Sequence, residues 1–489
     1  MMNLADALAH HVRARPDRPA LIAGPRTLYY RELDGLVRRW AAHLHALGIR
    51  DGQILGIALK DTPDHVIALY AAARLGAVAL PMDWRWTDEE KVALATRFRS
   101  AAILIEADAA PLAGVRCVPV DRAFHDGVAA STADLPFPAD GTAPLLLSLS
   151  SGTTGRPKGP MVTHAQFLRR FWTHWIDLGL NAGETYVSAT PLYFGGGRTF
   201  CMSQLFAGGT VVLFPPPYQP EALVDELARR GATSLFLVPT QLRRLLDLSD
   251  ERLAPVRRLR LLLSSGAPLH PDERRQIRAR LSGRFHEYYA STEGGGVSLL
   301  RPEDLDRHPD SVGRPVFGVE VGIFDDAMNR LPAGEVGRLG YRGPGVASGF
   351  YDDPEAGAEA FRQGWFFPGD LAMVNEAGFV FLRGRAKDMI IRGGVNIYPA
   401  EIEAVLQAHP DVRESAVVGW PSRVMGEEVA AFVSLRAPVS DDALRSFCAG
   451  RLAPYKVPKG FFPVDELPRN PSGKVLKAAL VARLAPIQP

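Results

Sequence analysis

The sequence predicts an α/β protein in which helices cover parallel sheets, and three patterns along the chain support this. In the first part of the chain, short apolar runs typical of buried strands alternate with stretches whose apolar residues recur at helical spacing. Such alternation implies parallel strands joined by helical crossovers. From Gly318 to Arg385 the pattern changes to short strands with glycine-rich turns, which indicates a β-subdomain. A smaller α+β unit follows.

The expected elements follow one another in chain order. Helices are predicted over 4–12, 33–47, 65–75, 220–230, 240–246 and 270–281, and strands over 54–59, 76–81, 101–105, 234–238, 259–263 and 286–289. The later unit is expected to contain helices over 399–408 and 441–452 and strands over 415–419 and 429–435. No repeat or low-complexity linker is visible, so the expected boundary lies at 384–388 and divides 1–384 from 385–489, with the β-subdomain at about 318–384.

Composition narrows the class of protein. A chain of 489 residues, 47% apolar and 22% charged, is typical of a soluble enzyme with two or more domains. A net charge of +2 without a basic block argues against nucleic acid as a partner. Three dispersed cysteines disfavour a disulfide framework or a zinc site and fit a reducing cytoplasm. Neither a signal peptide nor an apolar run of the ~18 residues needed for a membrane span is expected.

A loop rich in hydroxyls and glycines follows the apolar run at 144–147. Residues 148–159 read Ser-Leu-Ser-Ser-Gly-Thr-Thr-Gly-Arg-Pro-Lys-Gly. Glycines let backbone N–H groups approach phosphate oxygens, hydroxyls donate further hydrogen bonds, and Lys158 supplies counter-charge. The common NTPase loop has Gly before its Lys and Ser or Thr after it, whereas here Pro157 precedes and Gly159 follows. The loop therefore predicts a polyphosphate site of another kind, formed by Ser150, Ser151, Gly152, Thr153, Thr154, Gly155 and Lys158.

Three further segments end predicted strands with residues suited to a nucleotide. Gly266 and Ala267, after Leu-Ser-Ser at 263–265, let a purine lie against the backbone, although a tight turn is the alternative. In the segment 288–293, Tyr289 offers a stacking face, Thr292 a phosphate donor and Glu293 an oxygen ligand for Mg²⁺; a solvated loop acid is the alternative for Glu293. Asp370, after the aromatic run at 365–367, suits a ribose diol or simply forms a turn with its glycine.

Taken together, these segments resemble, in order, the motifs of the adenylate-forming superfamily, which includes acyl- and aryl-CoA synthetases, luciferases and the adenylation domains of peptide synthetases. Four more segments extend the resemblance over nearly the whole chain. They are Thr-Leu-Tyr-Tyr-Arg-Glu-Leu at 27–33, Pro-Leu-Tyr-Phe-Gly-Gly-Gly at 191–197, Gly-Arg-Ala-Lys-Asp at 384–388 and Asn-Pro-Ser-Gly-Lys at 470–474.

The resemblance implies a large N-terminal domain of αβαβα layers with a β-barrel subdomain, and a small mobile C-terminal lid. It also implies a two-step reaction, in which a carboxylate attacks the α-phosphate of ATP and a thiol then displaces AMP. Lys474 would bridge carboxylate and phosphate, Glu293 would hold Mg²⁺, and Lys387 would be the hinge of the lid. The other residues that the resemblance places around ATP are Gly266, Ala267, Pro268, Glu287, Tyr288, Tyr289, Thr292, Asp370 and Arg385. Gly393 and Gly394 would line the thiol channel.

Departures from the family pattern concern mainly the acyl pocket, assigned to Phe194, Gly195, Gly196, Arg198, Ser265 and Gly294. Phe194 stands where many relatives carry His, and Gly195 where peptide-synthetase domains place an Asp for the substrate ammonium, which disfavours an α-amino acid. Ala290 replaces a usual Gly. The glycines at 195–197 and 294–296 predict an open pocket. Arg198 is expected to point outward into solvent, because cations are seldom buried unpaired; pairing with a second substrate carboxylate is the alternative.

The function expected from these features is Mg²⁺- and ATP-dependent synthesis of an acyl-CoA from a small or medium non-amino carboxylic acid, aryl or alkyl. One alternative keeps the adenylation and transfers the acyl group to the phosphopantetheine thiol of a carrier protein. A second, in another class, is a non-catalytic paralogue that binds nucleotide or acyl ligand. A cytoplasmic monomer or homodimer is expected.

Overall fold

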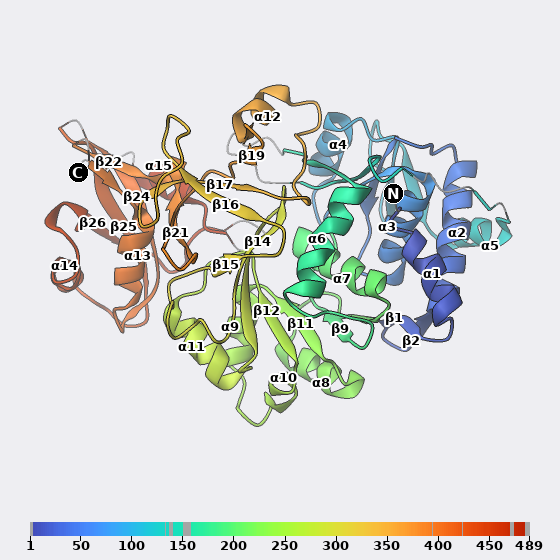
Figure 1. Ribbon diagram of the computed structural model, residues 1–489, viewed down its shortest axis with the longest axis horizontal. Helices are drawn as coiled ribbons and strands as arrows, with labels where there is room; N and C mark the ends of the chain where they lie inside the picture. Colours follow the sequence, from blue (N-terminus) through green and yellow to red (C-terminus); the bar gives the residue numbers. More distant parts are fainter. Residues whose placement is uncertain are drawn as a thin grey trace.

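The computed structural model describes residues 3–132, 134–135, 140–149, 158–393, 395–422, 424–469 and 474–484 (Figure 1). Within these ranges the strands form four sheets. Figure 1 shows the N-terminal elements, in blue, at one end of the molecule and the last sheet, in orange and red, at the other. The mixed α/β architecture predicted from the strand and helix patterns is confirmed.

The first sheet has six strands in the order β6-β5-β3-β4-β7-β8, parallel except for the last pair. Its strands are β3 (Ile54–Ala58), β4 (Val78–Pro81), β5 (Ala102–Glu106), β6 (Cys117–Val120), β7 (Pro144–Leu147) and β8 (Met161–Thr163). The helices of this region are α2 (Tyr30–Ala46), α3 (Pro63–Leu75), α4 (Asp88–Arg97), α5 (Arg122–Ala130) and α6 (His164–Ile176). β3 is buried along its whole length, as expected of a parallel strand covered on both faces.

The second sheet has nine strands in the order β15-β14-β13-β12-β11-β9-β10-β1-β2, and the run from β13 to β1 is parallel. Its strands are β1 (Pro19–Ala23), β2 (Arg26–Tyr29), β9 (Thr185–Ser188), β10 (Thr210–Leu213), β11 (Ser234–Leu237), β12 (Leu261–Ser264), β13 (Phe285–Ser291), β14 (Gly295–Leu300) and β15 (Arg314–Pro315). The accompanying helices are α1 (Asp6–Ala14), α7 (Gly195–Ala207), α8 (Pro220–Arg230), α9 (Pro239–Leu246), α10 (Ala254–Arg257) and α11 (Pro271–Arg280).

One apolar core joins the first two sheets. It contains side chains from β3 and β5 of the first sheet, from β1 and β12 of the second, and from α2, α3, α6 and α7. Helix α3 is buried almost throughout, because its sequence Val-Ile-Ala-Leu-Tyr-Ala-Ala-Ala leaves no polar face. The two sheets thus share this core, and each also packs into a further apolar cluster of its own.

The third and fourth sheets are largely antiparallel. The third contains β16 (Glu320–Phe324), β17 (Val336–Arg342), β18 (Phe361–Arg362), β19 (Trp365–Phe366), β20 (Asp370–Val374) and β21 (Val380–Arg385), with α12 (Pro354–Ala360) beside them. The fourth contains β22 (Ile390–Arg392), β23 (Val395–Ile397), β24 (Val412–Ser422), β25 (Gly426–Leu435) and β26 (Gly460–Pro463). Its helices are α13 (Pro399–Gln407), α14 (Asp441–Ala449) and α15 (Lys477–Leu484), and a 3₁₀ turn, η1 (Ala386–Asp388), joins the two sheets.

The fourth sheet has its own apolar cores, one against α13 and α14 and one against α15. The two units touch where α13 packs on β21. A Cβ placed on Gly384 would lie 3.9 Å from the Cβ of Ala400, in ordinary van der Waals contact. A division of the chain at 384–388 stays a prediction. None of the helices in the described ranges combines the length and apolar composition that crossing a bilayer requires.

Candidate active site

The nucleotide-type segments of the sequence follow the carboxyl ends of parallel strands. β12 ends at Ser264, immediately before the turn of Gly266, and β13 ends at Ser291, immediately before Thr292. β12 and β13 are hydrogen-bonded neighbours, with Ser264 opposite Glu287. In open α/β sheets ligands bind outside this edge. The predicted adenine turn and the predicted Thr292–Glu293 pair therefore belong to one edge of the second sheet.

The predicted phosphate loop is described only at its two ends. Ser150, Ser151, Gly152, Thr153, Thr154 and Gly155 lie outside the described residues, as does Gly394 of the predicted thiol channel. At the base of the loop, the Ser148 N–H donates to the carbonyl of Pro160 at 3.3 Å. The Tyr351 N–H donates to the carbonyl of Gly159 at 2.8 Å, and the ammonium of Lys158 lies 5.2 Å from the centre of the Phe350 ring. The two described ends of the loop are thus joined by a hydrogen bond between Ser148 and Pro160.

Asp370 is the centre of a cluster built from three strands. The Tyr289 hydroxyl donates to Asp370 Oδ2 at 2.5 Å, and Arg385 forms an ion pair with Asp370, with 2.9 Å between Nε and Oδ1. Asp370 and Arg385 are opposite each other in the β20–β21 pairing, so the register of that hairpin brings them together. Burial, reinforced by the Asp370 charge, holds the pKa of Tyr289 well above its usual range, so the phenol stays a hydrogen-bond donor.

Lys474 comes from the far end of the chain to this cluster. Its pKa is lowered, first by burial and then by the Arg385 charge; Lys387 lowers it further, whereas Asp370 and Asp388 raise it. Lys474 therefore lies within electrostatic range of the Asp370–Arg385 pair and of Lys387 in the η1 turn, and all four residues were predicted to belong to the site.

Arg170, which the sequence analysis missed, holds the segment that follows β13. Its buried guanidinium donates to the carbonyls of Thr292 at 3.1 Å, Glu293 at 2.7 Å and Gly345 at 2.9 Å. Burial lowers the pKa of Arg170 to about 10. Helical spacing could have revealed it, because Arg170 lies three residues after Phe167 and four before His174, on the buried face of α6.

Two residues assigned to the nucleotide have their side chains engaged elsewhere. Glu287 is buried in a two-pronged ion pair with Arg274, with N–O distances of 2.6 and 2.9 Å. The Tyr288 hydroxyl lies 2.7 Å from Thr173 Oγ1 inside the core. Successive residues of a strand face opposite sides of the sheet, so Tyr288 enters the core while Tyr289 reaches Asp370. For both residues the assignment stays a prediction, and it would have to rest on the backbone, because the side chains have partners inside the protein.

The predicted open pocket at 195–197 and 294–296 is wrong at most of these glycines. A Cβ on Gly196 would come within 2.8 Å of the Phe236 ring, and one on Gly294 would overlap the Tyr341 ring. Gly195 differs, because a Cβ there would meet nothing within 4 Å. A Cβ on Gly266 would lie 3.6 Å from the Phe194 ring, so Phe194 stands beside the predicted adenine turn. The contact brings the start of α7, where Phe194 and Gly195 lie, next to the turn after β12, which contains Ser265 and Gly266.

Arg198 is buried, and the expectation of a solvated arginine is wrong. Only 2% of its surface is exposed, and burial lowers its pKa to about 9. Its guanidinium donates to the carbonyls of Leu192 and Tyr193 and to Ser148 Oγ. Sequence composition could not show this, because the partners are carbonyl groups of the preceding turn and a hydroxyl fifty residues away.

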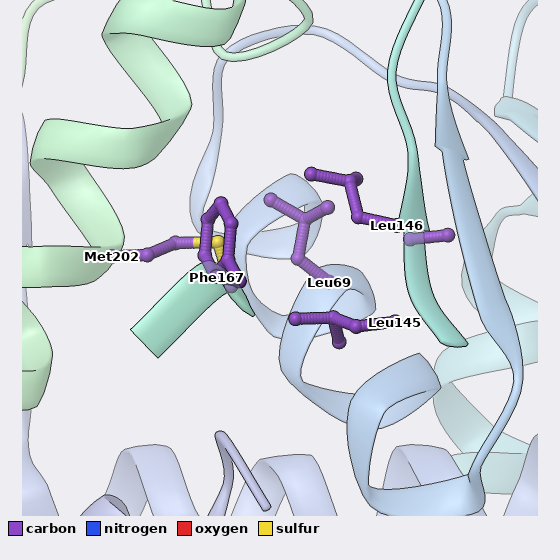
Figure 2. Close-up of a pocket in the computed structure, with 6 residues that line it drawn as sticks. Leu69, Leu145, Leu146, Phe167 and Met202 are labelled. Carbon is purple, nitrogen blue, oxygen red and sulfur yellow. The ribbon is translucent and has the colours of Figure 1, made fainter. Parts of the chain in front are cut away.

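The enclosed cavity drawn in Figure 2 is a packing void. It lies behind β7 and is lined by apolar side chains from α3, β4, β7, α6 and α7, namely Leu69, Ala79, Leu145, Leu146, Phe167 and Met202. Its volume of about 10 Å³ is close to the minimum for one water molecule, and no polar side chain lines it. It is too small for an acyl group.

The carboxylates near the predicted nucleotide site fit a magnesium ion that is held jointly by the protein and by phosphate oxygens, not by protein ligands alone. Among the described residues, no group of three or more His, Cys, Asp or Glu side chains converges as a metal cage. Mg²⁺ bound with nucleotides typically uses one or two carboxylates together with phosphate oxygens. A single carboxylate at Glu293, sharing the ion with phosphate oxygens, would satisfy that requirement.

Replacing Asp370 with asparagine is expected to weaken nucleotide binding. Asparagine keeps the shape but removes the charge that pairs with Arg385 and accepts from Tyr289, and hydrogen bonds to a charged group contribute more than neutral ones. A rise of about tenfold or more in the KM for ATP, measured with the acid substrate saturating, is expected. Asp326→Asn, at an exposed turn of the third sheet, is the control, and equal effects of the two would contradict the assignment.

Two family models match separate parts of the chain. The model of the AMP-binding enzyme family matches residues 8–351, and that of the AMP-binding enzyme C-terminal domain matches residues 401–474. A 2-succinylbenzoate–CoA ligase of Geobacillus kaustophilus is 32% identical, with 99% of each chain covered. A feruloyl-CoA synthase of an Amycolatopsis species is 34% identical, with 96% of this chain and 97% of that protein covered. A fatty acid–[acyl-carrier-protein] ligase of Streptomyces coeruleorubidus is 30% identical, with 98% of this chain and 96% of that protein covered.

Solved structures resemble this fold over nearly its full length. ATP-bound MatB from Rhodopseudomonas palustris superimposes with a TM-score of 0.91 at 30% identity, covering 99% of each chain. The o-succinylbenzoate CoA synthetase MenE from Bacillus subtilis, in complex with ATP and magnesium ion, gives a TM-score of 0.88 at 28% identity, covering 97% of this chain and 98% of that one.

Proposed function

The chain belongs to the AMP-binding enzyme family, and we propose that it is an AMP-forming acid–thiol ligase that activates a non-amino carboxylic acid with ATP and transfers the acyl group to coenzyme A. The observation that carries this proposal is the meeting of Lys474 with Asp370 and Arg385. A lysine on a second unit, within electrostatic range of a partly buried acid–arginine pair, suits a reaction in which two anions must approach each other.

In the first step the substrate carboxylate attacks the α-phosphate and pyrophosphate leaves. Negative charge develops on the α-phosphate, and a fixed ammonium at that point stabilises the transition state more than the ground state. We assign this role to Lys474. Asp370 and Arg385 would hold the ribose, and the loop ending at Lys158 would hold the departing pyrophosphate. Magnesium, when bound at Glu293, would neutralise the phosphate charge.

In the second step a thiol displaces AMP from the adenylate. We propose that the unit after 384 turns about Lys387 between the steps, withdrawing Lys474 and presenting the β22–β23 turn. Gly393 lies in this turn with a φ of +56°, which favours glycine, and its N–H donates to the Met425 carbonyl at 2.8 Å. A Cβ at this position would come within 2.9 Å of the Met425 methyl group, so a flexible side chain approaches the bare backbone closely, and we propose that a pantetheine arm takes its place.

The acid is proposed to be aryl or a short to medium alkyl chain. Gly195 faces open space and carries no carboxylate that could pair a substrate ammonium, and the Phe194 ring presents an apolar wall. CoA ligases for 2-succinylbenzoate and ferulate are among the relatives, which supports an aryl acid. Transfer to a carrier-protein thiol is the second candidate, favoured by the acyl-carrier-protein ligase among the relatives. A cytoplasmic location and a monomeric or homodimeric state belong to the same proposal.

A screen of acid-dependent exchange between ATP and pyrophosphate tests this function. Aryl, alkyl, dicarboxylic and β-amino acids are offered in parallel, with α-amino acids as the control class. We expect exchange with aryl or alkyl acids and none with α-amino acids. Acids that score are then offered CoA or a phosphopantetheinylated carrier protein, and the faster acceptor decides between the two candidates. Absence of exchange with every acid would contradict the proposal.

A further inference from the structure

Arg198 joins the two segments that the reaction has to bring together. It lies in the first turn of α7, and its Nη1 donates to the carbonyls of Leu192 at 3.1 Å and Tyr193 at 2.8 Å. These carbonyls belong to the turn that enters the acyl-pocket helix. Its Nη2 donates at 2.6 Å to Ser148 Oγ, at the base of the phosphate loop. One guanidinium therefore touches both the acyl turn and the nucleotide loop.

Both partners of Arg198 are themselves fixed. The N–H of Leu192 donates to the buried carboxyl of Asp61 at 2.7 Å, so the backbone of Leu192 is held on both sides of its Cα. Ser148 is 3% exposed and bonds through its N–H across the loop to Pro160. A movement of Ser148 must therefore move Arg198 or break the 2.6 Å hydrogen bond between them. A movement of Arg198 would in turn disturb its hydrogen bonds to the Leu192–Tyr193 turn.

The charge of Arg198 is not balanced by an acid within the described part of the chain. No carboxylate there forms an ion pair with it, and its buried Nε has no hydrogen-bond partner in that part either. Two other buried arginines do pair with acids, Arg274 with Glu287 and Arg74 with Asp134, whereas buried Arg170 resembles Arg198 in donating to carbonyls. The positive end of the α7 dipole adds to the charge of Arg198, and a buried cation without a counter-ion is costly. An anion bound by the neighbouring loop would offset that cost.

We propose that Arg198 is a positioning residue that couples the binding of ATP to the binding of the acid. The triphosphate supplies the negative charge that the buried guanidinium lacks, and the guanidinium then holds Ser148 and the Leu192–Tyr193 turn in one arrangement, which shapes the acyl pocket. Each substrate thereby raises the affinity for the other by the same factor. This inference rests on the proposed function and extends it to the coupling between the two substrate sites.

Calorimetric titration with α,β-methylene-ATP and magnesium tests the coupling, because this analogue binds without reacting. Its Kd is measured with and without a saturating acid chosen from the exchange screen. For the wild type we expect the acid to lower this Kd by about fivefold or more. Arg198→Met is expected to raise the Kd and to bring the ratio close to one. Arg198→Lys, which keeps the charge, is expected to retain part of the coupling. Arg74→Met, which removes a comparably buried guanidinium of α3, is the matched control and should keep the wild-type ratio.

Ser148→Ala provides a second variant should Arg198→Met fail to fold. It removes one hydrogen bond, leaves Arg198 in place, and is expected to lower the ratio as well. A wild-type ratio near one, or a ratio unchanged in both Arg198→Lys and Ser148→Ala, would overturn the coupling while leaving the ligase function intact. Absence of any acid-dependent exchange in the wild type would instead overturn the proposed function, and this inference with it.

Discussion

Replacing Lys474 with alanine is expected to slow formation of the acyl-adenylate by about 10²- to 10³-fold, the usual loss when one preorganised transition-state donor is removed. The lysine lies within electrostatic range of Asp370 and Arg385, the pair to which we assign the ribose, so its charge would act at the nucleotide. Thioester formation from a supplied acyl-adenylate is expected to stay close to the wild-type rate, because the proposed second step uses another face of the lid. Pyrophosphate exchange reports the first step, and release of AMP from synthetic adenylate with CoA reports the second.

The matched control is Lys459→Ala, which removes an exposed lysine of the same unit. It should leave both steps unchanged. Equal loss of the two steps in Lys474→Ala would contradict the division of labour between the two arrangements of the lid.

The pH profile gives an independent check on Lys474. Burial, aided by Arg385 and Lys387, lowers its pKa, so the folded protein loses this proton at a lower pH than an ordinary lysine does. Adenylation, which needs the charged form, is therefore expected to decline on the alkaline side below the usual lysine pKa. Lys474→Arg should move this decline to higher pH even where its rate is lower, because a guanidinium stays charged. A decline at the same pH in both enzymes would assign the titration to another group.

The sheets were predictable because their strands are short and continuously apolar. β3, with the sequence Ile-Leu-Gly-Ile-Ala, and β12, with Leu-Leu-Leu-Ser, read as buried strands at once, and the helices between them show helical spacing. Helix α8 (Pro220–Arg230) begins at its proline and ends before Gly231, as such signals predict. β6 (Cys117–Val120) was missed, since its alternating burial and a central proline give a weak pattern.

Side-chain environments were harder to predict than elements. Whether an arginine is buried depends on partners that are remote in sequence. Arg198 donates to Ser148 and Arg170 to the carbonyl of Gly345, and the residues around each arginine in the sequence do not indicate these partners. The same holds for Glu287, whose partner Arg274 lies on a neighbouring helix. By contrast, Tyr289 and Asp370 were identified through motif order, and the register of β20 with β21 explains why Arg385 accompanies them.

The glycine-rich stretches show why residue type alone misjudged the acyl pocket. Small residues were taken as evidence of space, yet a Cβ at Gly196 or Gly294 would collide with an aromatic ring that already fills it. Glycine marks a close approach as often as an opening. The difference depends on residues remote in sequence. The rings of Phe236 and Tyr341 lie against Gly196 and Gly294, whereas nothing lies within 4 Å of a Cβ at Gly195.

Replacing Glu293 with glutamine is expected to lower the adenylation rate by about 10²-fold at limiting magnesium, because one charge-stabilising contact in the transition state is lost. Glutamine keeps the size of the side chain but not its charge, and Mg²⁺ prefers charged oxygen ligands. Partial recovery is expected at high magnesium, since the phosphates still supply the other ligands. Exchange rates measured against free magnesium at constant ATP check this, and Glu303→Gln, an exposed acid after β14, is the control.

The contacts of Glu293 in the structure allow the Glu293→Gln variant to distinguish a metal-binding role from a structural one. The segment is held through backbone carbonyls: Arg170 donates to those of Thr292 and Glu293, and the Ala347 N–H donates to that of Glu293 at 2.8 Å. Glutamine preserves every one of these bonds, so the melting temperature should stay within the range of the Glu303 control. A carboxylate that served only to support the loop would lower stability and leave the magnesium dependence unchanged. Loss of rate with a shifted magnesium dependence at constant stability therefore identifies Glu293 as the residue that holds the metal.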